Sequence, residues 1–173
     1  MSIAVAAWYG YLIVHFALAP GWFGWRYRRL PYVLKWWPRN GYDFIESAYG
    51  LLVIGYTFAV SIGHFTEPHW IILPLICIVV GSGLILWSVV TLGRNWRIGQ
   101  DASDNSCIHV TNGPYRFLRH PIYCGMTISA LGQTLLSNCD LSGMILAGGT
   151  VAYVFFQSRA ESRRWSNRGR AAA

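Results

Sequence analysis

Charged residues are scarce in this sequence of 173 residues. Asp, Glu, Lys and Arg make up 12% of the chain, whereas about 25% is usual in a soluble domain. Apolar residues make up 54% of the chain, and they occur in long runs rather than in scattered patches. The composition therefore argues against a soluble domain, and the length suits one domain.

Paired cysteine motifs are absent as well. The four cysteines show no C-x-x-C spacing, so neither a disulfide framework nor a zinc site is indicated, and we expect no metal centre. The first apolar run lacks a basic segment before it and a cleavage site after it, so we expect a retained membrane span rather than a signal peptide.

Five apolar runs are candidates for membrane spans, since a spanning helix needs about 20 mostly apolar residues. They cover residues 3–24, 45–65, 70–92, 122–137 and 141–157. The last two runs are short, and the tight polar turn at 137–140 between them supports counting both. The sequence predicts an all-α polytopic membrane protein with five transmembrane helices and a single transmembrane domain over residues 1–173.

The basic residues fall on one side of this arrangement. They occupy the segments between the first and second spans, between the third and fourth, and after the fifth: Arg26, Arg28, Arg29, Lys35, Arg39, Arg94, Arg97, Arg116, Arg119, Arg159, Arg163, Arg164, Arg168 and Arg170. The positive-inside rule then predicts an external N-terminus and a cytoplasmic C-terminus, in a bacterial inner membrane or the endoplasmic reticulum. The net charge of +7 thus follows topology and does not indicate nucleic acid.

Two polar positions near the spans have structural interpretations. Asp43 and Glu46 fit the D-x-x-E capping pattern, so we expect them to cap the second span and to carry no chemistry. His15 lies within the first span, where a polar group is a candidate site residue. We favour the alternative, a hydrogen bond from His15 to another helix.

The longest basic segment, residues 93–121, is predicted to be a cytoplasmic loop that carries the site. It ends in a stretch dense in special residues, TNGPYRFLRHPIYCG over 111–125. Gly113 and Pro114 form a turn, and Pro121 suits the first position of a helix, so Arg119 and His120 precede the N-terminus of the fourth span. Such an end attracts anions. Each aromatic or basic residue alone is most simply an interfacial anchor, but their crowding within residues 115–123 indicates a site.

These residues resemble a known signature. Gly113-Pro114-Tyr115 followed by Arg119-His120-Pro121 and Tyr123 is similar to the motif of the isoprenylcysteine carboxyl methyltransferases and the related phospholipid N-methyltransferases. The resemblance implies a membrane enzyme that uses S-adenosylmethionine. It also implies contact with membrane lipids and a lipid-like or prenylated substrate that enters from the membrane. It implies Arg119 and His120 as catalytic residues. The residues that we expect, on the same resemblance, to bind the cofactor are Gly113, Tyr115, Arg119, His120, Tyr123 and Glu161.

Other functions stay open. The family places an acidic pair after its last span, whereas this chain has the single acid Glu161 among arginines, where it also suits helical ion pairs. This departure suggests a non-catalytic accessory subunit that keeps the fold and associates with other membrane subunits. The R-H-P-x-Y element also resembles that of membrane sterol reductases, which leaves a nicotinamide-dependent lipid reductase as a third possibility.

Overall fold

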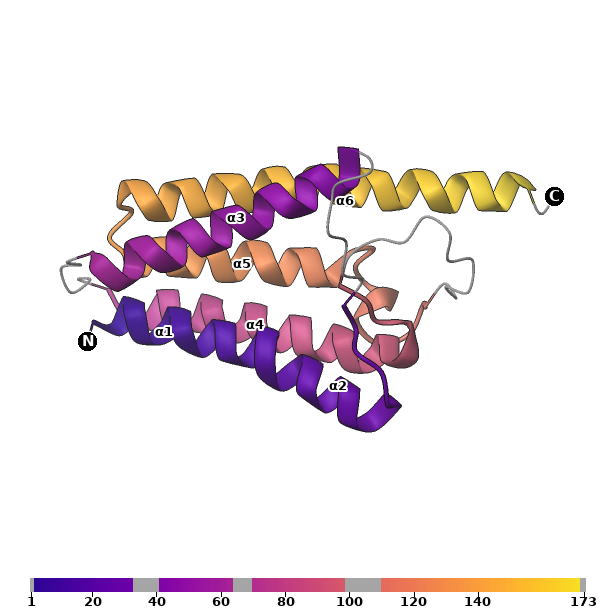
Figure 1. Ribbon diagram of the computed structural model, residues 1–173, viewed down its shortest axis with the longest axis horizontal. Coiled ribbons are helices and arrows are strands. Elements are labelled where there is room, and N and C mark those ends of the chain that lie inside the picture. Colours follow the sequence, from indigo (N-terminus) through magenta and orange to yellow (C-terminus); the bar gives the residue numbers. More distant parts are fainter. Residues whose placement is uncertain (1, 33–40, 64–69, 99–109, 172–173) are drawn as a thin grey trace.

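The computed structural model describes residues 2–32, 41–63, 70–98 and 110–171, and these form a bundle of long helices (Figure 1). In chain order the elements are α1 (Ile3–Leu12), the π-helical segment η1 (Ile13–Leu18), α2 (Ala19–Tyr27), α3 (Gly41–Ile62), α4 (Ile72–Leu92), the 3-10 turns η2 (Gly93–Asn95) and η3 (Gly113–Arg116), α5 (Pro121–Leu136) and α6 (Leu141–Ala171). No strand occurs among these residues, although an isolated bridge joins Tyr32 to Ile98.

The first rod of the bundle combines α1, η1 and α2, and its break has a local cause. Pro20 has no N–H to donate to the carbonyl of Phe16, four residues earlier. The helix widens to a π-helix over Ile13–Leu18, and the hydroxyl of Tyr32 donates to the free Phe16 carbonyl at 2.9 Å. The rod ends where Arg28 adopts a left-handed conformation, φ 56°. The chain then returns along the rod, which brings Tyr32 to the bridge with Ile98.

His15 lies in this widened turn and differs from expectation. Its side chain is buried, and neither ring nitrogen has a hydrogen-bond partner among the described residues. The ring packs instead on Tyr11, with 4.4 Å between centroids. The favoured hydrogen bond to another helix is therefore wrong, because in the π-helical turn the imidazole faces an aromatic ring.

The central helix α5 packs between α4 and α6. Small residues allow the backbones of α4 and α5 to touch: a Cβ on Gly125 would lie 2.6 Å from the carbonyl oxygen of Gly81, and one on Gly132 would lie 2.7 Å from that of Pro74. Close approach of this kind is common between membrane helices, which lack a hydrophobic drive to associate. It fixes the position of α5, whose first residues carry the candidate site.

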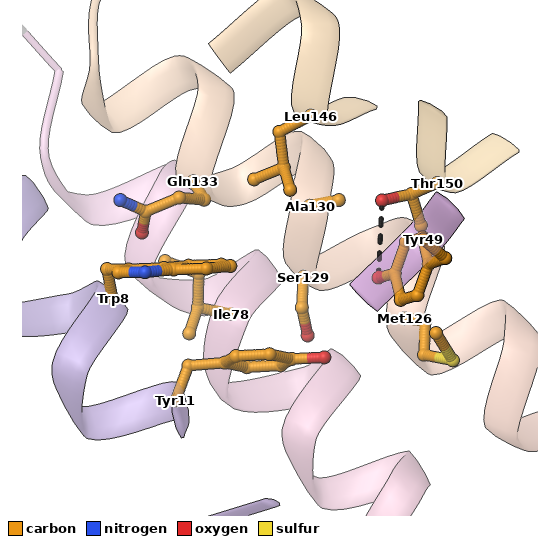
Figure 2. Close-up of a pocket in the computed structure, with 10 residues that line it drawn as sticks. All are labelled: Trp8, Tyr11, Tyr49, Ile78, Met126, Ser129, Ala130, Gln133, Leu146 and Thr150. Carbon is orange, nitrogen blue, oxygen red and sulfur yellow. Dashed lines mark hydrogen bonds between the residues drawn. The ribbon is translucent and has the colours of Figure 1, made fainter. Parts of the chain in front are cut away.

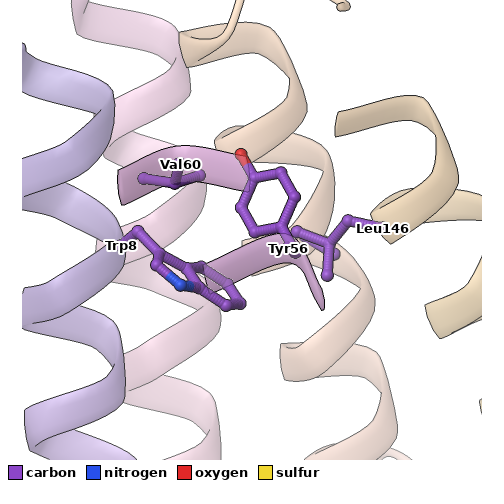
Figure 3. Close-up of a cluster of buried hydrophobic side chains, with 5 residues drawn as sticks. Trp8, Tyr56, Val60 and Leu146 are labelled. Carbon is purple, nitrogen blue, oxygen red and sulfur yellow. The ribbon is translucent and has the colours of Figure 1, made fainter. Parts of the chain in front are cut away.

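The helices α1, α3, α5 and α6 meet in a buried cluster (Figure 3). Trp8 packs edge-on against Tyr56, with 4.8 Å between ring centroids, and donates from Nε1 to the hydroxyl of Thr57 at 3.0 Å. Val60 and Leu146 complete the contact and are almost fully buried. A buried indole N–H needs a partner, so the Thr57 bond ties α1 to α3.

A tight turn joins α5 to α6, as predicted for 137–140. Asn138 and Cys139 both have positive φ, and the Asp140 carboxylate accepts from the backbone N–H of Gly143 at 2.9 Å. Burial alone would raise the pKa of Asp140, but hydrogen bonds from Ser137, Ser142 and Gly143 outweigh it and hold the pKa below its ordinary value. Asp140 is thus the N-cap of α6.

The outer surface of the bundle suits lipid. On α3, Leu51, Ile54 and Phe58 follow helical spacing and are each about two-thirds exposed. Four helical stretches are long and apolar enough to cross a membrane: Ile3–Tyr27, Asp43–Ile62, Ile72–Asn95 and Leu141–Arg163. The chain is therefore an all-α integral membrane protein.

Two predicted spans differ in length from the structure. The fourth forms a helix, α5, but its 16 residues cover about 24 Å at 1.5 Å per residue, less than the roughly 30 Å of a hydrocarbon core. The fifth, predicted to stop at 157, continues as one helix to Ala171. The added turns contain Arg, Ala and Glu and no proline, so they remain helical although they are too polar to span.

The segments that bear the arginines gather at one end of the bundle. The C-terminal ends of α2, α4 and α6 and the N-terminal ends of α3 and α5 all lie there (Figure 1). This arrangement agrees with a one-sided distribution of charge. The assignment of that end to the cytoplasm stays a prediction. The loop 93–121 is described apart from residues 99–109, which include Cys107.

Candidate functional site

The site loop is attached to the end of α4 through Gly113. This residue has φ +55°, and a Cβ there would lie 2.6 Å from the hydroxyl oxygen of Thr91. Only glycine therefore fits the turn and the close approach to α4. Pro114 follows as the second residue of the short turn η3 and is fully buried. The structure thus gives Gly113 a role in holding the loop, and its predicted place in a cofactor pocket stays a prediction.

His120 stands immediately before α5, as predicted, and its side chain turns toward α6. Its Nδ1 lies 3.1 Å from Oε2 of Glu161, and its Nε2 lies 3.3 Å from the hydroxyl of Ser162. The imidazole is 19% exposed and the Glu161 side chain 33% exposed, so the pair borders solvent without being fully in it. One face of His120 also stacks on Tyr123, with 5.7 Å between ring centroids.

Glu161 accepts a second, shorter hydrogen bond. The hydroxyl of Tyr123 donates to its Oε1 at 2.6 Å. The two carboxylate oxygens therefore bind the side chain just before α5, that of His120, and one from its first turn, that of Tyr123. This arrangement favours a role for Glu161 in the candidate site over the alternative of helical pairs alone. We call His120, Tyr123 and Glu161 the carboxylate cluster.

Tyr115 approaches the same carboxylate from the loop. Burial raises the pKa of its hydroxyl well above the usual value, and the nearby negative charge of Glu161 raises it further, while a hydrogen bond with Ser88 of α4 lowers it. Tyr115 lies in the turn η3, which packs on α4. His120 and Tyr123 of the loop motif contact Glu161 of the last helix directly, and Tyr115 lies close enough to be influenced by the charge of Glu161.

Arg119 behaves differently from its neighbour His120. Its side chain is exposed, and no hydrogen bond or ion pair joins it to the described residues. An exposed guanidinium beside the start of a helix, where N–H groups are free, is placed to receive an anion from solvent. The structure does not test whether it binds a cofactor.

A second set of residues behind the carboxylate cluster was missed by sequence reasoning. Tyr153 of α6 meets Tyr123 edge-on at 6.2 Å and stacks on Tyr49 of α3 at 4.2 Å. One turn before Glu161, the buried Gln157 donates to the carboxylate of Glu46 at 3.3 Å. Spacing within one helix gave no signal for these pairs, because they join α3 to α6.

The interpretation of Asp43 and Glu46 as a cap is wrong. The helix α3 begins at Gly41, two residues before Asp43, so Asp43 lies within the first turn. Its side chain is buried, and the Glu46 carboxylate accepts a hydrogen bond from Gln157 of α6.

The comparison with protein families agrees with this geometry. The model of the phospholipid methyltransferase family matches residues 69–167, more than half of the chain. The chain belongs to the phospholipid methyltransferase family. The matched region contains α4, both loop turns, α5 and α6 as far as the carboxylate cluster. This confirms the resemblance inferred from the loop motif.

A curated protein is also similar. Protein-S-isoprenylcysteine O-methyltransferase A of Arabidopsis thaliana is 32% identical over 97 residues, which cover 54% of this chain and 48% of that protein. The chain therefore spans about half the length of the curated relative that it matches. No solved structure matches it. Both helices of the first rod and α3 lie outside the residues that the family model matches.

Proposed function

We propose that this family member transfers a methyl group from S-adenosylmethionine to a lipid-like or isoprenylated substrate at the end of the bundle where α5 begins. The observation that carries the proposal is the carboxylate cluster, in which Glu161 of α6 binds His120 and Tyr123 of α5. The cluster joins α6 to the loop motif at that end of the bundle. The curated relative is named for methyl transfer to an isoprenylcysteine.

The residues present fit the chemistry of this cofactor. S-adenosylmethionine has a carboxylate, an ammonium, a sulfonium and an adenine ring, and when bound it supplies an activated methyl group. Arg119 offers an exposed guanidinium for the carboxylate. Glu161 offers negative charge for the cationic groups, and the rings of Tyr115, His120 and Tyr123 suit adenine or the sulfonium.

When the acceptor is a carboxylate, methyl transfer by displacement requires that the donor and the acceptor be aligned. It does not require a proton to be transferred. Catalysis then depends on positioning and on fixed charge. Glu161 fixes the rings of His120 and Tyr123 through its two oxygens. The turn η3, which packs on α4, positions Tyr115. The chain's own residues thus hold three rings and one negative charge at the head of α5.

The accessory-subunit alternative rested on the missing acidic pair in the last helix. Glu161 supports the enzyme over that alternative, because its single carboxylate binds two side chains of the family motif.

Binding of S-adenosylmethionine to the purified chain, measured by equilibrium dialysis, tests the proposal. Arg119→Ala is expected to weaken binding about tenfold or more, since a charged hydrogen bond contributes about 1.5–3 kcal/mol. Arg116→Ala is the matched control, because Arg116 is an exposed arginine of the same loop whose guanidinium packs on Phe117. It should bind like the native chain.

His120→Ala should also weaken binding, because it removes a ring of the cluster. Transfer of tritium-labelled methyl groups to farnesylcysteine or to phosphatidylethanolamine then identifies the acceptor class. If the folded native chain shows no binding of S-adenosylmethionine, the proposal is refuted.

A further inference from the structure

The cavity within the bundle, drawn in Figure 2, suits no charged ligand, because uncharged side chains from α1, α3, α4, α5 and α6 line it. Positive charge gathers instead at the surface, at the end of the bundle where α2 and α4 both terminate (Figure 1). Three arginines there surround two aromatic rings. None of them belongs to the carboxylate cluster.

Two of these arginines lie against one ring, that of Tyr27 at the end of α2. The guanidinium carbon of Arg26 is 5.7 Å from the ring centroid, and that of Arg94 is 5.9 Å from it. Both distances fall within the roughly 6 Å of a cation–π contact. Arg26 belongs to α2 and Arg94 to the turn η2 after α4. The ring of Tyr27 thus brings together two positive charges that are far apart in the sequence.

Arg29 adds a third charge beside this ring. Its guanidinium carbon lies 5.6 Å from the centroid of the Phe23 ring, and its Nη2 donates to the backbone carbonyl of Arg94. Phe23 in turn packs on Tyr27, with 4.9 Å between the ring centroids. We call Arg26, Arg29 and Arg94 the arginine patch.

The arginine patch has no negative partner among the residues that the structure describes. All three side chains are exposed, and no ion pair joins them to a carboxylate of that part of the chain. The C-terminal end of a helix attracts cations, which accounts for the bond from Arg29 to the carbonyl of Arg94. A guanidinium has five N–H donors, so one such bond uses a small part of the capacity of the patch. Because like charges repel each other, an external anion would stabilise it.

The depth of the arginine patch selects the kind of anion. Two stretches that are long and apolar enough to cross a membrane, Ile3–Tyr27 and Ile72–Asn95, both end at the patch. Trp22 meets the ring of Tyr27 edge-on at 6.1 Å, and Trp25 is 71% exposed. Tryptophan and tyrosine gather where hydrocarbon meets lipid headgroups. The guanidinium groups therefore lie at the level of lipid phosphates.

We propose that the arginine patch is a binding site for the headgroups of anionic phospholipids. Guanidinium groups bind phosphate oxygens through charge-assisted hydrogen bonds. An anionic lipid is favoured over a zwitterionic one, because the ammonium of a zwitterionic headgroup would meet three positive charges. Arg26 and Arg29 precede the region that the family model matches, and the patch shares no residue with the carboxylate cluster. The proposal therefore does not rest on methyl transfer.

Titration of the purified full chain with phosphatidylglycerol, followed by native mass spectrometry from detergent micelles, tests the site. Phosphatidylcholine with the same acyl chains is the zwitterionic probe. Each arginine near an anionic lipid surface contributes about fivefold in affinity. Phosphatidylglycerol should therefore bind about tenfold or more tightly than phosphatidylcholine, and added salt should weaken only the binding of phosphatidylglycerol.

Arg26→Gln combined with Arg94→Gln removes both charges from the ring of Tyr27 and should lower the affinity for phosphatidylglycerol about tenfold or more. Arg116→Gln combined with Arg159→Gln is the matched control. It also removes two exposed arginines, which lie on phenylalanine rings at 5.9 and 4.2 Å. Because these two rings are separate, the control should lose at most about twofold.

Circular dichroism checks that both double variants keep their helices. Should the variant of the arginine patch fail to fold, Arg26→Gln alone is compared with Arg159→Gln alone. Arg26→Gln should then lose about fivefold in affinity, and Arg159→Gln at most about twofold.

Equal losses in the patch variant and its control would overturn the proposal, because the patch would then be one part of a generally basic surface. Equal binding of phosphatidylglycerol and phosphatidylcholine to the native chain would also overturn it. So would release of phosphatidylglycerol by an equal concentration of inorganic phosphate, which would indicate recognition of the free anion. Binding of S-adenosylmethionine should be unchanged by Arg26→Gln, so this inference and the proposed function fail independently.

Discussion

Replacing Glu161 with glutamine removes one charge and leaves the size of the side chain unchanged. The native carboxylate accepts from Tyr123 at 2.6 Å and pairs with His120 at 3.1 Å. A hydrogen bond to a charged group contributes about 1.5–3 kcal/mol, and a neutral one about 0.5–1.5 kcal/mol. Because the Glu161 side chain is 33% exposed, water screens part of the difference, and we expect Tyr123 and Glu161 to be coupled by about 1 kcal/mol.

A double-mutant cycle of Tyr123→Phe and Glu161→Gln measures this coupling as a difference in the free energy of unfolding. Unfolding is followed by circular dichroism as sodium dodecyl sulfate is added to micelles of a mild detergent. Each single variant should lose about 1–2 kcal/mol, and the double variant should lose about 1 kcal/mol less than the sum.

The control cycle pairs Glu161→Gln with Tyr9→Phe, whose hydroxyl bonds to Ser61 on α3. Those effects should add within about 0.5 kcal/mol, because the two sites share no partner. If the Tyr123 cycle is as additive as the control cycle, the short hydrogen bond to Glu161 does not hold the site together, and the reasoning is refuted.

Three further changes test the packing of the bundle and its turns by thermal unfolding. Gly113→Ala should lose about 1–3 kcal/mol from its left-handed backbone and from the contact with Thr91, and adding Thr91→Ala should restore only the contact part. Gly125→Ala should lower the free energy of unfolding by at least about 1 kcal/mol, because the new Cβ meets the backbone of α4. Gly83→Ala, with nothing within 4 Å of the new Cβ, should raise it by up to about 1 kcal/mol through helix propensity. Equal effects of the two changes would contradict the close packing of α4 and α5. Asp140→Ala should lose about 1 kcal/mol of capping at neutral pH. Because the pKa of Asp140 is lowered in the fold, its contribution is present above its ordinary pKa and disappears as the pH falls below about 4. The variant and the native chain should then have the same stability. A difference in stability that persists in acid would contradict the capping role of Asp140.

The parts of the fold that depend on long runs of sequence could be predicted. The third span was predicted at 70–92, and α4 covers Ile72–Leu92. Twenty apolar residues leave few alternatives in a membrane. Helix ends were less predictable, because hydropathy marks where a segment leaves the lipid and not where its helix stops. The helix α6 therefore extends well past the predicted end, to Ala171.

Within the site, residue types were predictable and directions were not. Arg119 and His120 are neighbours in the chain, yet one is exposed and the other turns toward α6. His120 itself has a non-helical backbone conformation, φ −134° and ψ 66°, just before the helix begins. The direction of these side chains depends on where the turn at Gly113 meets α4. That contact involves residues of two elements, so it could not be predicted from the loop alone.

The first rod and α3 matter to the site although the family match begins after them. Glu161 reaches His120 only if α6 keeps its position beside α5. On one side, α6 is held through the turn at Asp140. On the other, α3 supports it through the stack of Tyr49 on Tyr153 and the bond from Gln157 to Glu46. The rod in turn holds α3, because Trp8 donates to Thr57. A chain of contacts thus runs from α1 to the carboxylate cluster, and weakening it far from the loop should lengthen the distance between His120 and Glu161.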